Sequence, residues 1–326
     1  MMTSQPIQPS RRTHAVGFAL LWLLTVAGGW VAAQESSAPP PAFHIAFSGD
    51  MFAEINVNDA KAALKAWFLT VAQERRVNTS PEPMIVDDTK TMAGLLQSNL
   101  LDAVEVTALE YSALSQAAKF DPLFVASTAG RITEQYVVLV HADSKIETLA
   151  GLQGRHLISY DQYRACLAQV WLDTLLVQQG LRPSAQFFDQ VTPKIKLTQV
   201  VLPVFFHQCD ACLVTRSGFE IMKELNPQVG RQLKIIVTSP EVVPAVFCFR
   251  ADVAAATKAP YVVGLRELHQ HAAGQQVLTI FHREKLEEQP AACLQSALDL
   301  MQTYNRLCGE TNHAQVATAK SEGAVK

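Results

Sequence analysis

The sequence predicts an α/β protein with two lobes joined by two crossover strands. Short apolar runs alternate with stretches of helical periodicity, a pattern typical of parallel sheets covered by helices. Residues 136–144 form a β-branched run with an aromatic start and a polar end, which predicts one buried strand between two such blocks. A second crossing near residues 238–240 would return the chain, so a ligand would lie between the lobes.

Length and charge set broad limits on the class of protein. The chain has 326 residues, of which 49% are hydrophobic, so it can bury one large core or two medium ones. The formal net charge is -3, and the sequence contains neither a basic stripe nor a block of like charges. These features argue against nucleic acid as a partner.

The N-terminus has the layout of a secretion signal. Arg11 and Arg12 precede an apolar stretch at 15–27, and Val31-Ala32-Ala33 then supplies small residues before a cleavage point. We expect a cleaved signal peptide at 1–33, a proline-rich tether at 34–42 and a mature protein in the periplasm. An uncleaved membrane anchor is the alternative, because the apolar stretch nearly reaches the ~20 residues that a span needs.

The first lobe is expected over residues 43–138, with a return over 241–308. The clearest helix runs from about Asn58 to Arg75, because its apolar residues recur at i, i+3, i+4 and i+7. Asp87, Asp88 or Thr89 is expected to cap the next helix. Strands are predicted at 44–48, 83–86, 101–106, 123–126 and 245–249, and further helices at 108–118 and 284–308.

The second lobe is expected over residues 139–240. Asp161 is predicted to cap a long helix that stops at Gly180, and residues 195–206 are read as helical despite Pro203. Strands are predicted at 156–159, 210–215 and 234–238, and a helix at 219–225. The small, polar tail at 309–326 is predicted to be disordered.

Six cysteines follow the predicted cleavage point, and in an oxidising compartment we expect some of them to pair. Cys209 and Cys212 form a C-x-x-C motif, which makes a thiol oxidoreductase an alternative function. Against it, Cys212 lies inside an apolar strand, where the two side chains would point to opposite faces. No second C-x-x-C or H-x-x-H completes a zinc set, so no metal is predicted.

Several weak motifs in a fixed order give the chain a family resemblance. They are Asp87-Asp-Thr-Lys-Thr-Met and the strand after it, Thr107-Ala-Leu-Glu-Tyr111, and the segments 136–144, 146–157, 208–214 and 238–244. Together they resemble the phosphate/phosphite/phosphonate-binding (PhnD-like) periplasmic solute-binding proteins of ABC transporters. The resemblance implies a type II periplasmic-binding-protein fold, no enzymatic activity, no cofactor and a monomer that delivers a small oxyanion to an ABC permease.

One segment departs from that family. Where the family has a small Ser/Thr-Gly run after the first strand of the second lobe, this chain has Asp161-Gln-Tyr-Arg-Ala-Cys166. Bulky side chains replace hydroxyls there, and an aspartate would oppose an anion unless it only caps the helix. The departure weakens the phosphonate assignment and favours, as an alternative, a ligand sensor coupled to a membrane sensor kinase.

The predicted ligand-binding residues lie at strand ends and helix starts, where an open α/β sheet binds ligands and where helix amides are free for an anion. Arg164 is the fork-shaped donor that could hold an oxyanion bidentately. The complete set comprises Ser48, Phe52, Thr89, Lys90, Thr91, Tyr111, Tyr136, Tyr160, Tyr163, Arg164, His207 and Asp210.

Overall fold

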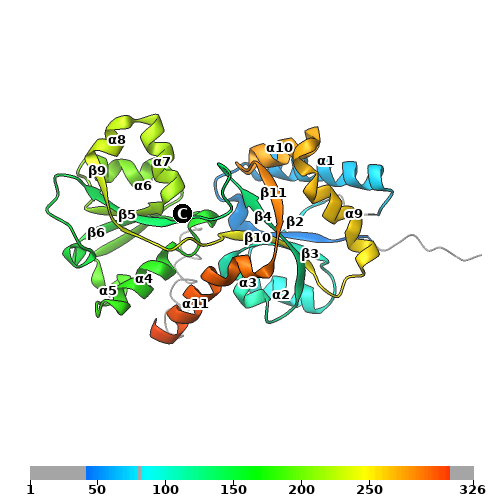
Figure 1. The fold of residues 1–326 in the computed structure, drawn as a ribbon, viewed down its shortest axis with the longest axis horizontal. Coiled ribbons are helices and arrows are strands. Elements are labelled where there is room, and N and C mark those ends of the chain that lie inside the picture. The colour runs from blue at the N-terminus through cyan, green and yellow to red at the C-terminus, as the bar shows by residue number, and fades with distance from the viewer. Residues whose placement is uncertain (1–41, 79–81, 309–326) are drawn as a thin grey trace, which may run out of the picture. The chain divides into compact units, whose positions relative to one another are not determined.

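The structure, a computed structural model, describes residues 42–78 and 82–308. The predicted signal peptide, all but the last residue of the predicted tether and the predicted disordered tail lie outside the described residues. In the part of the chain that is described, none of the helices combines the length and the apolar character that a membrane span requires. Figure 1 shows the two lobes, each built on its own sheet.

The first sheet has six strands. In spatial order they are β11 (Lys285–Gln289), β4 (Phe120–Ser127), β10 (Ala245–Arg250), β3 (Ala103–Thr107), β1 (Ile45–Ser48) and β2 (Met84–Val86). β1 pairs in parallel with β2 and β3, whereas β10 runs antiparallel between β3 and β4. The sheet is therefore mixed rather than parallel, because β10 enters it from the other lobe.

The second sheet repeats this arrangement with five strands. In spatial order they are β7 (Gln190–Lys194), β6 (His156–Tyr160), β8 (Ala211–Thr215), β5 (Tyr136–His141) and β9 (Leu233–Thr238). β6 pairs in parallel with β7 and β8, and β5 is antiparallel to both of its neighbours. The predicted two-lobed α/β fold is confirmed, and each sheet contains one antiparallel strand that is reached through a crossover, β10 in the first sheet and β5 in the second. In the first sheet the edge strand β11 is also antiparallel to its neighbour β4.

The two crossovers are the segments that join β4 to β5 and β9 to β10, and they lie side by side. Glu134 and Val242 exchange backbone hydrogen bonds of 2.8 and 2.9 Å, which form an isolated antiparallel bridge between the crossovers. Closer to the second lobe, the Ser239 hydroxyl accepts a 2.7 Å hydrogen bond from the backbone N–H of Tyr136, the first residue of β5. The carboxyl ends of β3 and β8 lie here, since Thr107 pairs with Ala245 and Thr215 pairs with Tyr136. The predicted lobe boundaries at residues 138 and 240 stay predictions.

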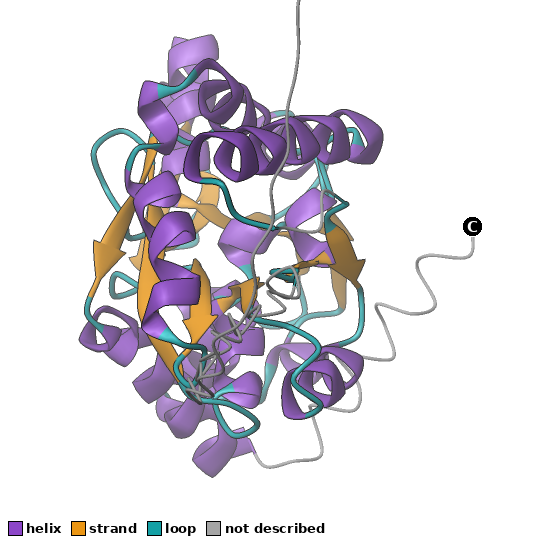
Figure 2. Ribbon diagram, turned by 90° about the vertical axis from the view of Figure 1, so that its right-hand side faces the viewer, coloured by secondary structure: helices purple, strands orange, loops and turns teal. Residues whose placement is uncertain are grey.

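Helices cover the first sheet on both sides (Figure 2). α1 (Val57–Arg75) begins at Asn56, whose side chain accepts hydrogen bonds from two backbone N–H groups, and its buried face is the predicted one. The helix expected at 108–118 is shorter, because α3 ends at Leu114. The remaining helices are α2 (Thr89–Gln97), α9 (Ala255–Arg266), α10 (Ala272–Ile280) and the 3-10 turns η1 (Gly49–Phe52), η4 (Leu268–Gln270) and η5 (Ala291–Leu294).

In the second lobe the expected helix cap at Asp161 is wrong. The side chain of Gln162 accepts the N–H of Arg164 and starts the 3-10 turn η3 (Tyr163–Ala165), and α4 (Ala168–Gln178) begins only afterwards. Gly180 does take the predicted left-handed conformation, with φ of 73°. The other helices are η2 (Leu149–Leu152), α5 (Ser184–Phe187), α6 (Leu197–Phe205), α7 (Arg216–Leu225) and α8 (Pro227–Gln232).

The C-terminal segment differs from the predicted single helix over 284–308. Its first part is the edge strand β11, which pairs with β4, and only Gln295–Cys308 forms the helix α11. The physical reason is the neighbouring strand: β4 offers an unpaired edge, and Pro290 separates the strand from the helix. α11 packs against α4 of the second lobe and α3 of the first (Figure 1).

Strand alternation divides the core of each lobe between the two faces of its sheet. In β1, Ile45 and Phe47 join one core cluster and Ala46 joins the cluster on the opposite face. In β5, Val138 and Val137 separate in the same way. Because both faces are covered by helices, these strands are apolar throughout, which is why the sequence shows runs rather than alternation.

Candidate functional site

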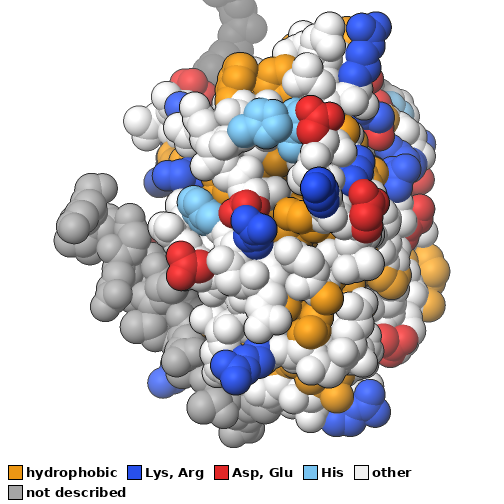
Figure 3. Space-filling model, turned by 90° about the vertical axis from the view of Figure 1, so that its left-hand side faces the viewer, with side chains coloured by type: hydrophobic (Ala, Val, Ile, Leu, Met, Phe, Trp, Pro, Cys, Tyr) orange, Lys and Arg blue, Asp and Glu red, His pale blue; other side chains and the backbone are white. Residues whose placement is uncertain are grey.

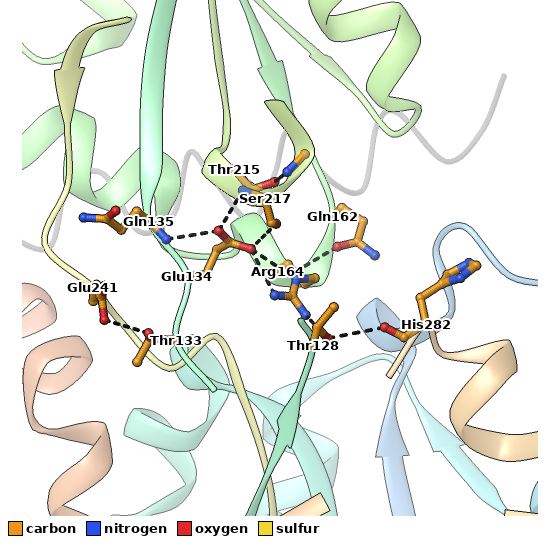
Figure 4. A network of polar contacts seen from close by, with 11 residues as sticks. Thr128, Thr133, Glu134, Gln135, Gln162, Arg164, Thr215, Ser217, Glu241 and His282 are labelled. Atoms are coloured by element: carbon orange, nitrogen blue, oxygen red, sulfur yellow. Dashed lines mark hydrogen bonds and ion pairs between the residues drawn. The ribbon is translucent and has the colours of Figure 1, made fainter. Parts of the chain in front are cut away.

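A buried carboxylate lies where the crossovers meet the second lobe. The Glu134 side chain is 3% exposed and accepts hydrogen bonds at both oxygens. Oε1 accepts from the backbone N–H groups of Gln135 at 3.1 Å and Ser217 at 3.2 Å, and Oε2 accepts from the Ser217 hydroxyl. We call Thr128, Glu134, Arg164 and Ser217 the Glu134 group (Figure 4).

Arg164 supplies the cation of this group. Its Nη2 and Nε donate to Glu134 Oε2 at 3.0 and 3.3 Å, and its Nη1 donates to the Thr128 hydroxyl at 3.0 Å. Thr128 directly follows β4 of the first sheet, so the guanidinium connects that sheet's end to the second lobe. The side chain of Arg164 is 18% exposed, so the ion pair is only partly reached by water.

The start of α7 completes the arrangement. Thr215 caps the helix by accepting the N–H of Gly218 at 3.1 Å, and Arg216 donates its N–H to Gln135 O at 2.7 Å. The N–H of Ser217 is left for Glu134. A helix start carries a partial positive charge, so a carboxylate at this position is stabilised by the helix as well as by Arg164.

A second carboxylate caps the equivalent end of the first lobe. Glu110 accepts the Ser48 hydroxyl at 2.8 Å and the Thr107 N–H at 2.9 Å, forming a capping box at the start of α3. Burial raises the pKa of Glu110, while the hydrogen bonds from Thr107 and Ser48 lower it by less. Asp50 lies close enough to add to the increase, so this end of the first lobe is rich in carboxylates.

Free helix amides were expected at these positions, and the structure differs. The side chain of Asp88 accepts the N–H of Thr91 in α2, that of Ser48 accepts the N–H of Asp50, and that of Gln162 accepts the N–H of Arg164. Together with the caps of α3 and α7, the protein's own groups occupy donors at each of these starts. Buried or half-buried amides require such partners in the absence of another acceptor.

Two tyrosines of the second lobe reach the first. The Tyr160 hydroxyl donates to Glu54 Oε2 at 3.0 Å. Tyr163 is buried among the apolar residues of the first lobe's core, and the guanidinium of Arg283 lies 5.5 Å from its ring centre. Both residues belong to the predicted set, and both lie at the contact between the lobes.

A small cavity lies inside the first lobe, beneath Arg283. Its volume is about 20 Å³, and Glu105 and Arg283 are its charged lining residues. These two form a buried ion pair, while Nε and Nη2 of Arg283 have no hydrogen-bond partner among the described residues. A volume of this size accommodates one water molecule rather than a ligand.

The structure brings only part of the predicted set together. Ser48, Tyr160, Tyr163 and Arg164 lie at the contact between the lobes or beside the crossovers. The first turn of α2 contains Thr89, Lys90 and Thr91. The side chain of Asp88 caps this turn by accepting both the N–H and the hydroxyl of Thr91.

Three predicted aromatic residues lie in the core. Phe52 packs edge-on against Phe281 at 5.5 Å, and Tyr111 contacts Phe120 at 5.7 Å. Tyr136 is fully buried beside Trp171 in the second lobe. Their side chains are buried within the lobes, and a ligand-binding role for them stays a prediction.

His207 and Asp210 lie at the opposite end of the second sheet. Asp210 precedes β8 and accepts the N–H of His156, the first residue of the parallel strand β6, at 3.0 Å. Ligands bind beyond the carboxyl ends of such strands, and these residues stand at the amino ends. They are therefore separated from Arg164 by the length of the sheet.

Sequence reasoning missed Glu134, Thr128 and Ser217. No motif marks a single glutamate in a connecting segment, and its partners come from three separate parts of the chain. The available signal was physical: Glu134 lies two residues before the buried strand β5 at a crossing, where a charge requires a partner.

The thiols are unsuited to redox chemistry. All six cysteines lie in the described part of the chain and none is paired, which corrects the expected disulfides. Burial raises the pKa of both Cys209 and Cys212, so the reactive thiolate is disfavoured at neutral pH. The Cys209 thiol instead donates to His156 O at 3.1 Å.

Comparisons with known proteins agree with this architecture. Residues 55–292 match the sequence model of a family described as ABC transporter, phosphonate, periplasmic substrate-binding protein. No curated protein sequence matches the chain.

Solved structures show the same fold at low identity. A Xanthomonas citri protein bound to ATP is 16% identical, with a TM-score of 0.63 over 83% of this chain and 100% of that one. The binding-protein component of an ABC phosphonate transporter from Pseudomonas aeruginosa is 15% identical, with a TM-score of 0.57 over 87% and 96%. PhnD1 from Prochlorococcus marinus, in complex with methylphosphonate, is 12% identical, with a TM-score of 0.56 over 81% and 99%.

Proposed function

The chain belongs to the family of periplasmic substrate-binding proteins of ABC phosphonate transporters, and from this premise we propose that it captures a small oxyanion beside Arg164. Phosphate, phosphite and small phosphonates are the ligands of this class. The protein would act without catalysis, as a monomer exported by its signal peptide, and deliver the ligand to a membrane permease.

One observation carries the proposal: the Glu134 carboxylate already collects the donors that an oxyanion needs. An arginine fork, a hydroxyl and two backbone N–H groups converge on its two oxygens. Charge-assisted hydrogen bonds of this kind suit phosphate and phosphonate oxygens equally well. In this proposal Glu134 holds the donors in place until a ligand oxyanion replaces it.

Replacement of Glu134 sets the affinity. The ligand must displace a carboxylate that is only 3% exposed. Only molecules in which Glu134 has moved away from Arg164 and Ser217 can bind, so the apparent affinity is lowered in proportion to their fraction. Entry also requires the hydrogen bond between Tyr160 and Glu54 to break, because it joins the lobes. Hinged separation of two lobes is the ordinary way in which such a fold admits a ligand.

Thermal unfolding with a panel of anions tests the proposal. Phosphate, phosphite, methylphosphonate and sulfate are added in turn, with sodium chloride at equal ionic strength as the control. A ligand bound only by the folded protein and present at 100 times its Kd adds about 2.7 kcal/mol, which raises Tm measurably. If every anion leaves Tm at the chloride value, the proposed function is wrong.

A further inference from the structure

Two histidines and an aspartate meet at the end of the second lobe that lies away from the crossovers. His141 is the last residue of β5, Asp143 lies in the turn after it, and His207 follows α6. Within residues 42–78 and 82–308, these form the one group of three potential ligand residues whose donor atoms all lie within 4.8 Å of one another. Figure 3 views this end of the molecule, where histidine side chains lie beside acidic ones.

The distances are close to those of a metal site. His141 Nδ1 lies 3.7 Å from Asp143 Oδ2, and the ligand atoms of all three side chains lie within 4.8 Å of one another. With metal–ligand bonds of 2.0–2.1 Å, two ligand atoms of a tetrahedral site are about 3.4 Å apart. The side chain of Asp143 is 85% exposed, so packing does not restrict its rotation toward a bound ion.

The ring of His141 presents the atom that a metal requires. The backbone N–H of Asp143 donates to His141 Nδ1 at an N···N distance of 3.2 Å, so Nδ1 carries a lone pair directed toward Asp143. A metal ion bound at Nδ1 would take the place of this hydrogen bond. The Ser144 hydroxyl donates to His141 O at 2.6 Å and fixes the turn that carries Asp143. The His141 side chain is only 8% exposed, so its position is held by packing.

His207 is brought to this place by an unusual backbone conformation. Its φ is +56°, in the left-handed region that a non-glycine residue seldom adopts, and its N–H donates to Val204 O at 3.2 Å. The chain thereby turns directly after α6, which leaves the exposed ring beside that of His141, with ring centres 3.8 Å apart and ring planes tilted by 38°. Residues 66 positions apart in the sequence (207 minus 141) are thus joined at one surface point.

We propose that His141, Asp143 and His207 bind a divalent transition-metal ion of the zinc class, with water completing the coordination. Two imidazoles and one carboxylate favour Zn²⁺, Co²⁺, Ni²⁺ or Cu²⁺ over Mg²⁺ and Ca²⁺, which prefer oxygen ligands. The ion would connect the end of β5 to the turn before β8. The site is separate from the Glu134 group, because β5 begins at the crossover with Tyr136 and ends here.

Titration of the untagged, metal-free protein with CoCl₂ and ZnCl₂ in phosphate-free buffer tests this proposal. We expect one Co²⁺ per chain with the visible absorption of a low-symmetry site, displacement by Zn²⁺, and a higher Tm with either ion. MgCl₂ at the same concentration should leave Tm unchanged.

His207→Ala is the informative variant, because His207 is exposed and its loss leaves the fold intact, whereas His141 is buried. The matched control is His269→Ala, which removes an exposed histidine of the first lobe. We expect at least tenfold weaker Co²⁺ binding for His207→Ala and for Asp143→Asn, and unchanged binding for the control. No metal binding by the parent protein, or equal binding by His207→Ala and the control, would overturn the site.

Discussion

Arg164 Nη2 and Glu134 Oε2 lie 3.0 Å apart and form an ion pair that joins the second lobe to the first crossover. The pair unites the two features on which binding depends. Glu134 belongs to the crossover segment that pairs with Val242 of the other crossover, and Arg164 is the cation that an oxyanion would contact in the proposed function. Movement of the lobes and release of the cation are therefore coupled through one carboxylate.

Glu134→Ala should destabilise the protein by about 3 kcal/mol, because it leaves a largely buried arginine without its counter-charge. Urea unfolding followed by circular dichroism measures the change. Glu241→Ala, on the other crossover, removes an exposed carboxylate that accepts from the Thr133 hydroxyl and should cost less than about 0.5 kcal/mol. Equal losses for the two variants would show that the Glu134 ion pair does not support the fold.

Glu110 predicts a pH dependence of stability. Its folded pKa is raised, so its contribution to stability is present at acid pH and is lost as the pH rises through that value. Glu110→Gln removes this titration, so the variant should gain stability relative to the parent protein as the pH rises above the ordinary glutamate pKa of about 4.3. Unfolding free energies of both proteins at several pH values provide the test, and a constant difference would contradict it.

The fold was largely predictable because it follows from local patterns. α1 was anticipated from the spacing of its apolar residues, and its whole apolar face is buried as expected. β11 was not anticipated, because the segment Lys285–Gln289 is mostly polar and becomes a strand only through its pairing with β4. Tertiary pairing of this kind leaves no periodic signal in the sequence.

The site was only partly predictable for a different reason. Tyr160 ends a strand and Tyr163 and Arg164 follow it, positions that chain order reveals. Tyr111 and Tyr136 also stand at element ends, but their rings pack inward, and side-chain direction depends on neighbours. The helix dipole suggested that N–H groups at the helix starts would be free for a ligand. Instead, the carboxylates of Glu134 and Glu110 accept hydrogen bonds from such N–H groups.

Tyr160 and Glu54 provide a measurable contact between the lobes. Burial and then Glu54 raise the pKa of the tyrosine, so the hydroxyl remains a donor at neutral pH. A double-mutant cycle of Tyr160→Phe and Glu54→Gln should give a coupling energy of about 1 kcal/mol in urea unfolding. Additive effects of the two changes would mean that the hydrogen bond at 3.0 Å contributes nothing in solution.

Cys209 and Cys212 should react slowly with alkylating reagents in the folded protein. Because burial raises the pKa of Cys212 and Cys209, iodoacetamide at pH 7 should modify the native protein at these positions far more slowly than the urea-unfolded protein. Mass spectrometry after timed alkylation gives the rates. Insulin reduction by the parent protein that disappears in a Cys209→Ser/Cys212→Ser variant would instead support an oxidoreductase.

Oxyanion binding by Arg164 is the central claim, and calorimetric titration of methylphosphonate and phosphate tests it most directly. Glu134→Gln and the double variant Glu134→Gln/Arg164→Gln are compared, since both lack the carboxylate and differ only in the cation. The account predicts tighter binding than the parent protein for Glu134→Gln and at least tenfold weaker binding for the double variant than for Glu134→Gln. Equal affinities of the two variants would contradict it.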